Sequence, residues 1–297
     1  MGQVVKLGFL LPGFLLLTVG CGELGEVTAL GGIADGMRGA LPGVSEAFAH
    51  SCERRAAIVA RIPVAELPPN IQVTPDCAPS KALAKQLGAD QTALVEYLEA
   101  LSKLGSGAAF TYGKAIGADV TTVNDFSVSA GVNATVAADA QKAGVAALTL
   151  SGKLADLATQ HIRAREVRRI VLEANPGVQQ LTAALYQAGD VDYGIVLANE
   201  KGFLEAYYEG PLAAAGAGDR LTSMLVQRQY DDDAARWQRR REAAVAYGAV
   251  MQEVGMLHAK LTQAARDRAG FAGRVKALTP EVNRLKDEVA KLQGEVQ

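Results

Sequence analysis

The chain has 297 residues, of which 30 are Lys or Arg and 32 are Asp or Glu, giving a formal net charge of −2 at pH 7. A nucleic-acid-binding protein would carry a strong basic excess, so this balance argues against nucleic acid as a partner. Aromatic residues make up only 5% while alanine and glycine are abundant, and such a composition favours helix over sheet. The length allows one large domain or two small ones with a sizeable core.

An apolar segment follows the basic residue Lys6 and ends at a cysteine, Cys21. A secretory signal peptide begins with a charged region, continues with a short apolar segment and ends with small residues at the cleavage site, as here. The apolar segment is too short for a transmembrane helix, which needs ~20 apolar residues. Its last four residues read Thr18-Val19-Gly20-Cys21. They resemble the lipobox of bacterial lipoproteins, in which the cysteine thiol receives a diacylglycerol and the signal is cut just before it. The resemblance covers only these first residues, and Thr18 stands where that family usually has leucine.

The resemblance implies that residues 1–20 are removed between Gly20 and Cys21, and that Cys21 carries acyl chains such as palmitate. Each buried methylene contributes ~0.8 kcal/mol of membrane attachment, so two or three chains anchor a protein durably. Because the two residues after Cys21 include no aspartate, the sorting rule of enteric bacteria implies the outer membrane, with the protein facing the periplasm. Residues 21–29 would form a short membrane-proximal tether. The alternative is an ordinary cleaved secretory signal, or an uncleaved anchor, with Cys21 merely nearby.

Two further cysteines are present, Cys52 and Cys77. Because the bacterial periplasm is an oxidising compartment, we predict that they form a disulfide. In the chain-entropy model a loop of this size would stabilise the fold by ~3 kcal/mol. The alternative is two unrelated buried thiols.

The first part of the exported chain has apolar residues at intervals of three and four, which predicts one face of a helix. These residues are Leu30, Ile33, Met37, Leu41, Val44, Phe48 and Cys52. Pro42 lies inside this pattern and should kink or divide the helix. Residues 62–80 contain five prolines and cannot continue it. We interpret them as a crossing segment held to the first helix by the disulfide, the alternative being a binding loop.

A second helical run has Ser80 or Asp90 as candidate N-caps and becomes glycine-rich over residues 105–117. Either this helix ends near Gly105 or it packs closely against a neighbour there. Residues 134–173 are expected to form one long helix that Asn175-Pro176-Gly177 ends sharply.

Two more helices are expected before the C-terminal segment. One runs from Val178 to about Gly210-Pro211, with a break left open at Gly189 and Gly194, and the next runs from about residue 221 to 265. We therefore predict an all-α fold, an elongated antiparallel bundle of long helices over residues 30–275.

The C-terminal segment, residues 278–296, carries apolar residues in an a/d heptad pattern and starts with Thr279-Pro280, an N-cap followed by proline at N1. The heptad residues include Leu278, Val282, Leu285, Val289 and Leu292. This amphipathic helix either docks on the protein's own bundle or binds a partner, including a second copy, and fewer than three heptads are short for an independent coiled coil.

Motifs that carry chemistry are missing from the sequence. There is no HExxH, CxxC, GxSxG or Walker A sequence. His161 and His258 fall on the apolar stripes of two long helices and could meet as a metal site in a bundle. The paired Glu-x-x-His pattern of diiron bundles is absent, however, so we interpret them as core residues and expect no catalytic residue, metal or cofactor.

These features lead to three hypotheses for function. The first is a non-enzymatic lipid-anchored envelope protein, a structural or adaptor component that is attached to the lipid membrane through Cys21 and contacts an envelope protein. The second is a helical bundle that binds or senses a small molecule or glycan, with a cavity at the glycine-rich residues 105–117. The third is a membrane-active helical protein.

Overall fold

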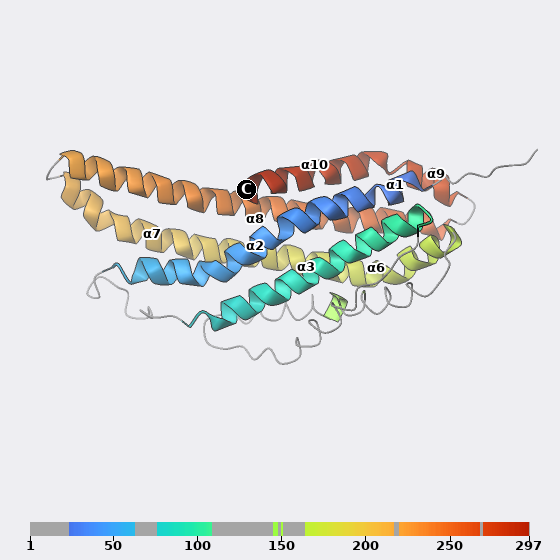
Figure 1. The fold of residues 1–297 in the computed structure, drawn as a ribbon, viewed down its shortest axis with the longest axis horizontal. Coiled ribbons are helices and arrows are strands. Elements are labelled where there is room, and N and C mark those ends of the chain that lie inside the picture. Colours follow the sequence, from blue (N-terminus) through green and yellow to red (C-terminus); the bar gives the residue numbers. More distant parts are fainter. Residues whose placement is uncertain are drawn as a thin grey trace, which may run out of the picture.

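The computed structural model describes residues 24–62, 76–108, 145–147, 150, 164–216, 220–267 and 270–296. No described residue lies in a strand, which confirms the prediction of an all-α fold. Long helices lie side by side in an elongated bundle (Figure 1). The described helices, long and short, are α1 (Gly25–Thr28), α2 (Leu30–Val59), α3 (Ala78–Gly105), α6 (Ala164–Tyr186), the π-helix η3 (Gln187–Asp192), α7 (Tyr193–Gly216), α8 (Arg220–Arg266), α9 (Phe271–Lys276) and α10 (Thr279–Val296).

Helix α2 runs through Pro42 as one helix, so the proline does not divide it. A proline inside a helix costs roughly 3 kcal/mol because it removes a hydrogen bond and crowds the preceding turn. The apolar face around it offsets this cost, since Leu41 and Val44 are each only 1% exposed and one fully buried aliphatic side chain contributes ~1.5–3 kcal/mol. The predicted apolar stripe is therefore correct, and it outweighs the proline.

The prediction that residues 175–177 end a helix was wrong, because α6 runs through Pro176 to Tyr186. The reason is again burial: Val171, Val178 and Leu181 lie on one face and are completely buried. The earlier part of the predicted helix, residues 134–163, lies outside the described residues apart from 145–147 and 150.

The break expected at Gly189 appears as a π-helical segment, η3, between α6 and α7. A Cβ atom on Gly189 would lie 2.1 Å from the ring of Tyr247, so glycine permits η3 to approach α8 this closely. Helix α7 continues past its predicted end through Pro211 to Gly216. Helix α8 spans Arg220–Arg266, and its bounds match the predicted 221–265 within one residue.

The short tether expected over residues 21–29 is contradicted from Leu24 onward. Residues 25–28 form α1, and Val27 is completely buried in the core. Glu26 accepts a hydrogen bond from Thr279 Oγ1 at 3.0 Å, so the start of the described chain lies against the start of α10. Figure 1 shows this end of the bundle and, far from it, the end of α7 and the beginning of α8.

Candidate functional site

The predicted lipidation site lies outside the described residues. Gly20 and Cys21 precede Leu24, where the description begins. Acylation of Cys21 therefore stays a prediction.

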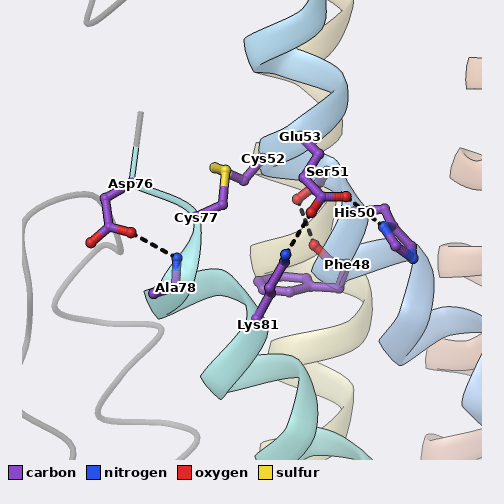
Figure 2. Close-up of a disulfide and its surroundings, with 9 residues drawn as sticks. All are labelled: Phe48, His50, Ser51, Cys52, Glu53, Asp76, Cys77, Ala78 and Lys81. Atoms are coloured by element: carbon purple, nitrogen blue, oxygen red, sulfur yellow. Dashed lines mark hydrogen bonds and ion pairs between the residues drawn. A yellow bond between two sulfur atoms is a disulfide. The ribbon is translucent and has the colours of Figure 1, made fainter. Parts of the chain in front are cut away.

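The predicted disulfide between Cys52 and Cys77 is present, with 5.6 Å between the two Cα atoms. It fixes the beginning of α3 to the last third of α2 (Figure 2). Close by, Glu53 of α2 forms an ion pair with Lys81 of α3 at 2.6 Å, and the hydrogen bond from Lys81 lowers the pKa of Glu53 to about 2. The bridge therefore lies beside a second, ionic link between the same two helices.

Helix α3 begins earlier than its candidate N-caps suggested. It starts at Ala78, and its backbone N–H donates to Asp76 Oδ1 at 2.9 Å. Ser80 therefore lies inside the first turn, and Asp90 lies in the middle of the helix, 1% exposed. Of the proline-rich crossing segment, residues 63–75 lie outside the described residues.

The heptad residues of the C-terminal helix are buried within the chain itself, in a groove between α2 and α8. Leu278, Val282, Leu285, Val289 and Leu292 are between 0% and 9% exposed. On the α2 side, a Cβ atom on Gly36 would lie 2.7 Å from Val289 Cγ1. On the α8 side, Arg284 pairs with Glu253 at 2.9 Å. In this structure the heptad face is therefore covered by the protein's own bundle, and it is not open to a partner.

His258 is a core residue, as the sequence suggested. It is 1% exposed, and its Nε2 lies 2.7 Å from the hydroxyl of Tyr97 while its Nδ1 lies 3.2 Å from Oδ1 of Asn175. Desolvation lowers its pKa to about 3, so the ring is neutral at physiological pH. His161 lies outside the described residues, and within the described ranges no cluster of His, Cys, Asp and Glu could hold a metal ion.

The glycine-rich stretch at 105–117 is described only as far as Ala108. Helix α3 ends at Gly105, where a Cβ atom would lie 3.0 Å from Val27 Cγ1, so the helix both ends and packs closely there. Gly107 has φ +73°, a conformation that favours glycine.

Helices α7 and α8 extend beyond the ends of α2 and α3 as a two-helix hairpin (Figure 1). We call this hairpin, residues 201–216 and 220–237, the α7–α8 arm. Most of its described side chains are exposed, and three large apolar ones near its tip are about three-fifths exposed. These are Leu221 at 63%, Met224 at 62% and Leu225 at 59%.

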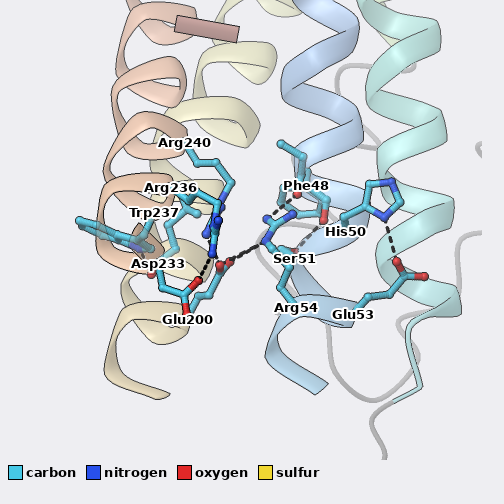
Figure 3. A network of polar contacts seen from close by, with 12 residues as sticks. Phe48, His50, Ser51, Glu53, Arg54, Glu200, Asp233, Arg236, Trp237 and Arg240 are labelled. Atoms are coloured by element: carbon cyan, nitrogen blue, oxygen red, sulfur yellow. Dashed lines mark hydrogen bonds and ion pairs between the residues drawn. The ribbon is translucent and has the colours of Figure 1, made fainter. Parts of the chain in front are cut away.

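A network of charged side chains lies where the arm joins the bundle (Figure 3). Its centre is Glu200 of α7, which is only 3% exposed. Arg54 Nε of α2 donates to both carboxylate oxygens of Glu200, at 3.2 and 3.3 Å, and Arg240 of α8 donates to Oε1. One buried carboxylate thus holds two arginines from two other helices.

A cavity of about 250 Å³ opens beside this network between α2, α7 and α8. Its charged lining is Arg54, Arg61, Arg236 and Arg240 with Glu200 and Asp233. Asp233 accepts hydrogen bonds from Arg236 and from the Tyr208 hydroxyl, the latter at 2.7 Å. The cavity is therefore predominantly cationic in a chain whose net charge is slightly negative.

Sequence reasoning missed this network. In the structure Arg236 pairs with Asp233 on the same helix, and Arg240 reaches Glu200 on another helix. One signal was present: Glu200 falls three residues after Leu197 and four before Leu204, on the buried face of α7. A carboxylate that stays ionised in a buried position is stabilised by a cationic partner, and here the partners come from other helices.

Comparison with known proteins gave no match to a protein-family model, to a curated protein or to a solved structure. None of the described helices combines the length and apolarity needed to cross a membrane.

Proposed function

We propose that this protein is a non-enzymatic, lipid-anchored adaptor of the bacterial envelope that presents the α7–α8 arm to a partner protein. One observation supports this most strongly. The described chain begins at one end of the bundle, three residues after the candidate lipidation site Cys21, whereas the exposed apolar residues of the arm tip lie at the far end.

The length of α8 gives the scale of this separation. Its 47 residues correspond to about 70 Å at the helical rise per residue. Helix α8 begins at the arm tip and ends near α9 and α1. A membrane that holds Cys21 would therefore lie about 70 Å from the tip if the bundle stands upright on it.

The arm tip suits a protein partner because three of its exposed side chains are large and apolar. Met224 and Leu225 are adjacent and about three-fifths exposed, and burying the rest of this pair in an interface would contribute up to ~2–4 kcal/mol. No described helix could take the arm across a membrane. We therefore assign the tip to a partner protein in the envelope.

The anchor is tested by substituting Cys21→Ser and labelling producing cells with a palmitate analogue. We expect the wild-type protein to incorporate the label and fractionate with membranes, and the variant to lose both properties. Equal labelling of the two proteins would contradict lipidation at this cysteine.

The docking surface is tested by placing a photo-crosslinking amino acid at Met224 in intact cells. We expect one dominant adduct of defined mass. The matched control is the same amino acid at Gln229, an exposed polar position of α8, which should give little of this adduct. The adaptor proposal fails if both positions yield the same diffuse set of products, or if neither yields any.

A second candidate function, a bundle that binds a small molecule or glycan, is favoured by a different observation. A cavity of about 290 Å³ lies between α2 and α3 next to Pro42. Its lining includes Gln91, 3% exposed, whose side-chain oxygen has no hydrogen-bond partner among the described residues. Native mass spectrometry of protein purified from its own host should reveal such a ligand as a discrete added mass.

A further inference from the structure

We propose that the cationic cavity at the base of the α7–α8 arm binds a doubly charged phosphoryl group. The site is formed by three helices, α2, α7 and α8, and does not involve the arm tip or the candidate lipidation site. The proposal therefore stands independently of the adaptor function.

The charge balance of the cavity favours the binding of an anion. Four arginines and two carboxylates line it, and their formal charges sum to +4 and −2, which leaves +2. The two carboxylates are already engaged, Glu200 by Arg54 and Arg240, and Asp233 by Arg236. This residual double positive charge attracts an anion into a partly enclosed site, where charges interact more strongly than in bulk water.

Hydrogen-bond donors in the cavity also lack acceptors. Nε of Arg240 is buried and has no hydrogen-bond partner within the described part of the chain. Arg61, which is exposed at the cavity rim, forms no ion pair or side-chain hydrogen bond with any described residue. Burial also lowers the pKa of Arg240 despite the nearby Glu200, so its positive charge is incompletely compensated. A bound anion would satisfy both the donors and the charge.

The arrangement favours a phosphoryl group over a single carboxylate. Guanidinium groups present forked pairs of donors that match phosphate oxygens, and a phosphate monoester carries about −1.5 to −2 charges near neutral pH. The volume of about 250 Å³ accommodates such a group together with a few waters. A monocarboxylate would neutralise only half of the excess charge.

Two arginines are held in place before any ligand binds. Glu200 orients Arg54 and Arg240, and Arg54 Nη2 also donates to the backbone carbonyl of Ala47 at 2.8 Å. Arg61 lacks such restraints and is therefore the residue expected to close on the anion. Its substitution should weaken binding without disturbing the bundle.

The proposal is tested by isothermal titration calorimetry of the folded protein with inorganic phosphate and, separately, glycerol 3-phosphate, in buffers of equal ionic strength. We expect saturable binding at one site below about 10 mM. Preference for glycerol 3-phosphate would indicate a phosphomonoester as the natural ligand, and preference for phosphate would indicate the free ion.

Three variants make the test specific. Arg61→Gln should weaken the affinity by about tenfold, because it removes a charge from the cavity. Asp233→Asn should strengthen it, because it raises the net charge by one. Arg239→Gln removes an exposed arginine of α8 that does not line the cavity, and should leave the affinity within about twofold of the wild type.

Circular dichroism of each variant establishes that the bundle is folded. The proposal is overturned if the wild type shows no saturable binding of either probe, or if Arg61→Gln and Arg239→Gln weaken binding equally, which would indicate non-specific attraction to surface arginines.

Discussion

A buried carboxyl group on α3 should make the stability of the bundle depend on pH in a way that one substitution removes. Asp90 is 1% exposed. One of its oxygens accepts a hydrogen bond from Gln86 Nε2 at 2.7 Å, and the other has no partner among the described residues. Desolvation raises the pKa of Asp90 from 3.8 to about 8, so the carboxyl is mostly protonated in the folded protein at neutral pH.

The direction of the effect follows from this raised pKa. Below pH 3.8 the group is protonated in both states, and the folded state pays no cost. As the pH rises from 3.8 towards 8, the unfolded chain releases the proton while the folded protein retains it, so stability is lost progressively. Each pH unit in this window costs ~1.4 kcal/mol. From about pH 5 to about pH 7.5 the loss attributable to Asp90 is therefore ~3 kcal/mol.

The assay is urea unfolding of the wild type and of Asp90→Asn at these two pH values. Asparagine stays neutral throughout, so all other titrating groups cancel in the difference between the two proteins at each pH. We expect the variant to gain ~3 kcal/mol over the wild type between about pH 5 and about pH 7.5. Asp287→Asn on α10, where the side chain is exposed, is the control and should change by less than ~0.5 kcal/mol. A difference for Asp90→Asn that does not vary with pH would refute the reasoning.

Three further predictions concern stability. Cys52 and Cys77 are 25 residues apart, and replacing both by serine should lower the free energy of unfolding by ~3.5 kcal/mol. In urea unfolding carried out with reductant, the wild type should lose the disulfide as well, and the two proteins should then be equally stable. Gly36→Ala should destabilise the bundle by ~1–3 kcal/mol, because the new Cβ atom would lie 2.7 Å from a side chain of α10. The control Gly32→Ala, whose Cβ atom meets nothing within 4 Å, should stabilise the bundle by up to ~1 kcal/mol in the same assay. Equal effects of the two substitutions would contradict the close packing of α10 on α2. In the folded protein the pKa of His258 is lowered from 6.5 to about 3, so the contribution of the neutral ring to the free energy of unfolding is complete above pH 6.5 and is lost as the pH falls. The wild type should therefore lose ~2 kcal/mol relative to His258→Gln between about pH 7.5 and about pH 5. A difference between the two proteins that stays constant with pH would contradict this.

Apolar spacing predicted the helices of the bundle well because they bury apolar stripes against one another, as α2 does from Leu30 to Val59 and α8 does from Ala243 onward. It predicted α2 from Leu30 and α8 within one residue of its bounds. Local rules for proline failed at Pro176, where they predicted a helix end, and the division that they allowed at Pro42 does not occur. The deciding quantity there was the apolar area buried against other helices, which is a tertiary property and cannot be read from the residues around a proline.

The candidate site was harder to predict because its partners come from distant parts of the sequence. Arg54 and Glu200 are separated by 146 residues, and Asp90 looked like a helix N-cap because short polar residues favour that position. The disulfide was predictable because the sequence offered only one pair of cysteines after Cys21. For the heptad face the sequence left two alternatives open, docking on the protein's own bundle or on a partner, and the structure shows the first, in which the glycines of α2 at positions 36 and 43 permit the close approach of α10.

The position of α10 also bears on the order in which the chain can fold as it is synthesised. The groove that α10 fills is walled on one side by α2, and the contact between Glu26 and Thr279 joins residues 253 positions apart in the chain. During synthesis the glycine-lined face of α2 therefore emerges long before the segment that covers it. We expect nascent chains to expose this face to chaperones and proteases until α10 is complete, so proteolysis should drop sharply once residue 296 has emerged from the ribosome.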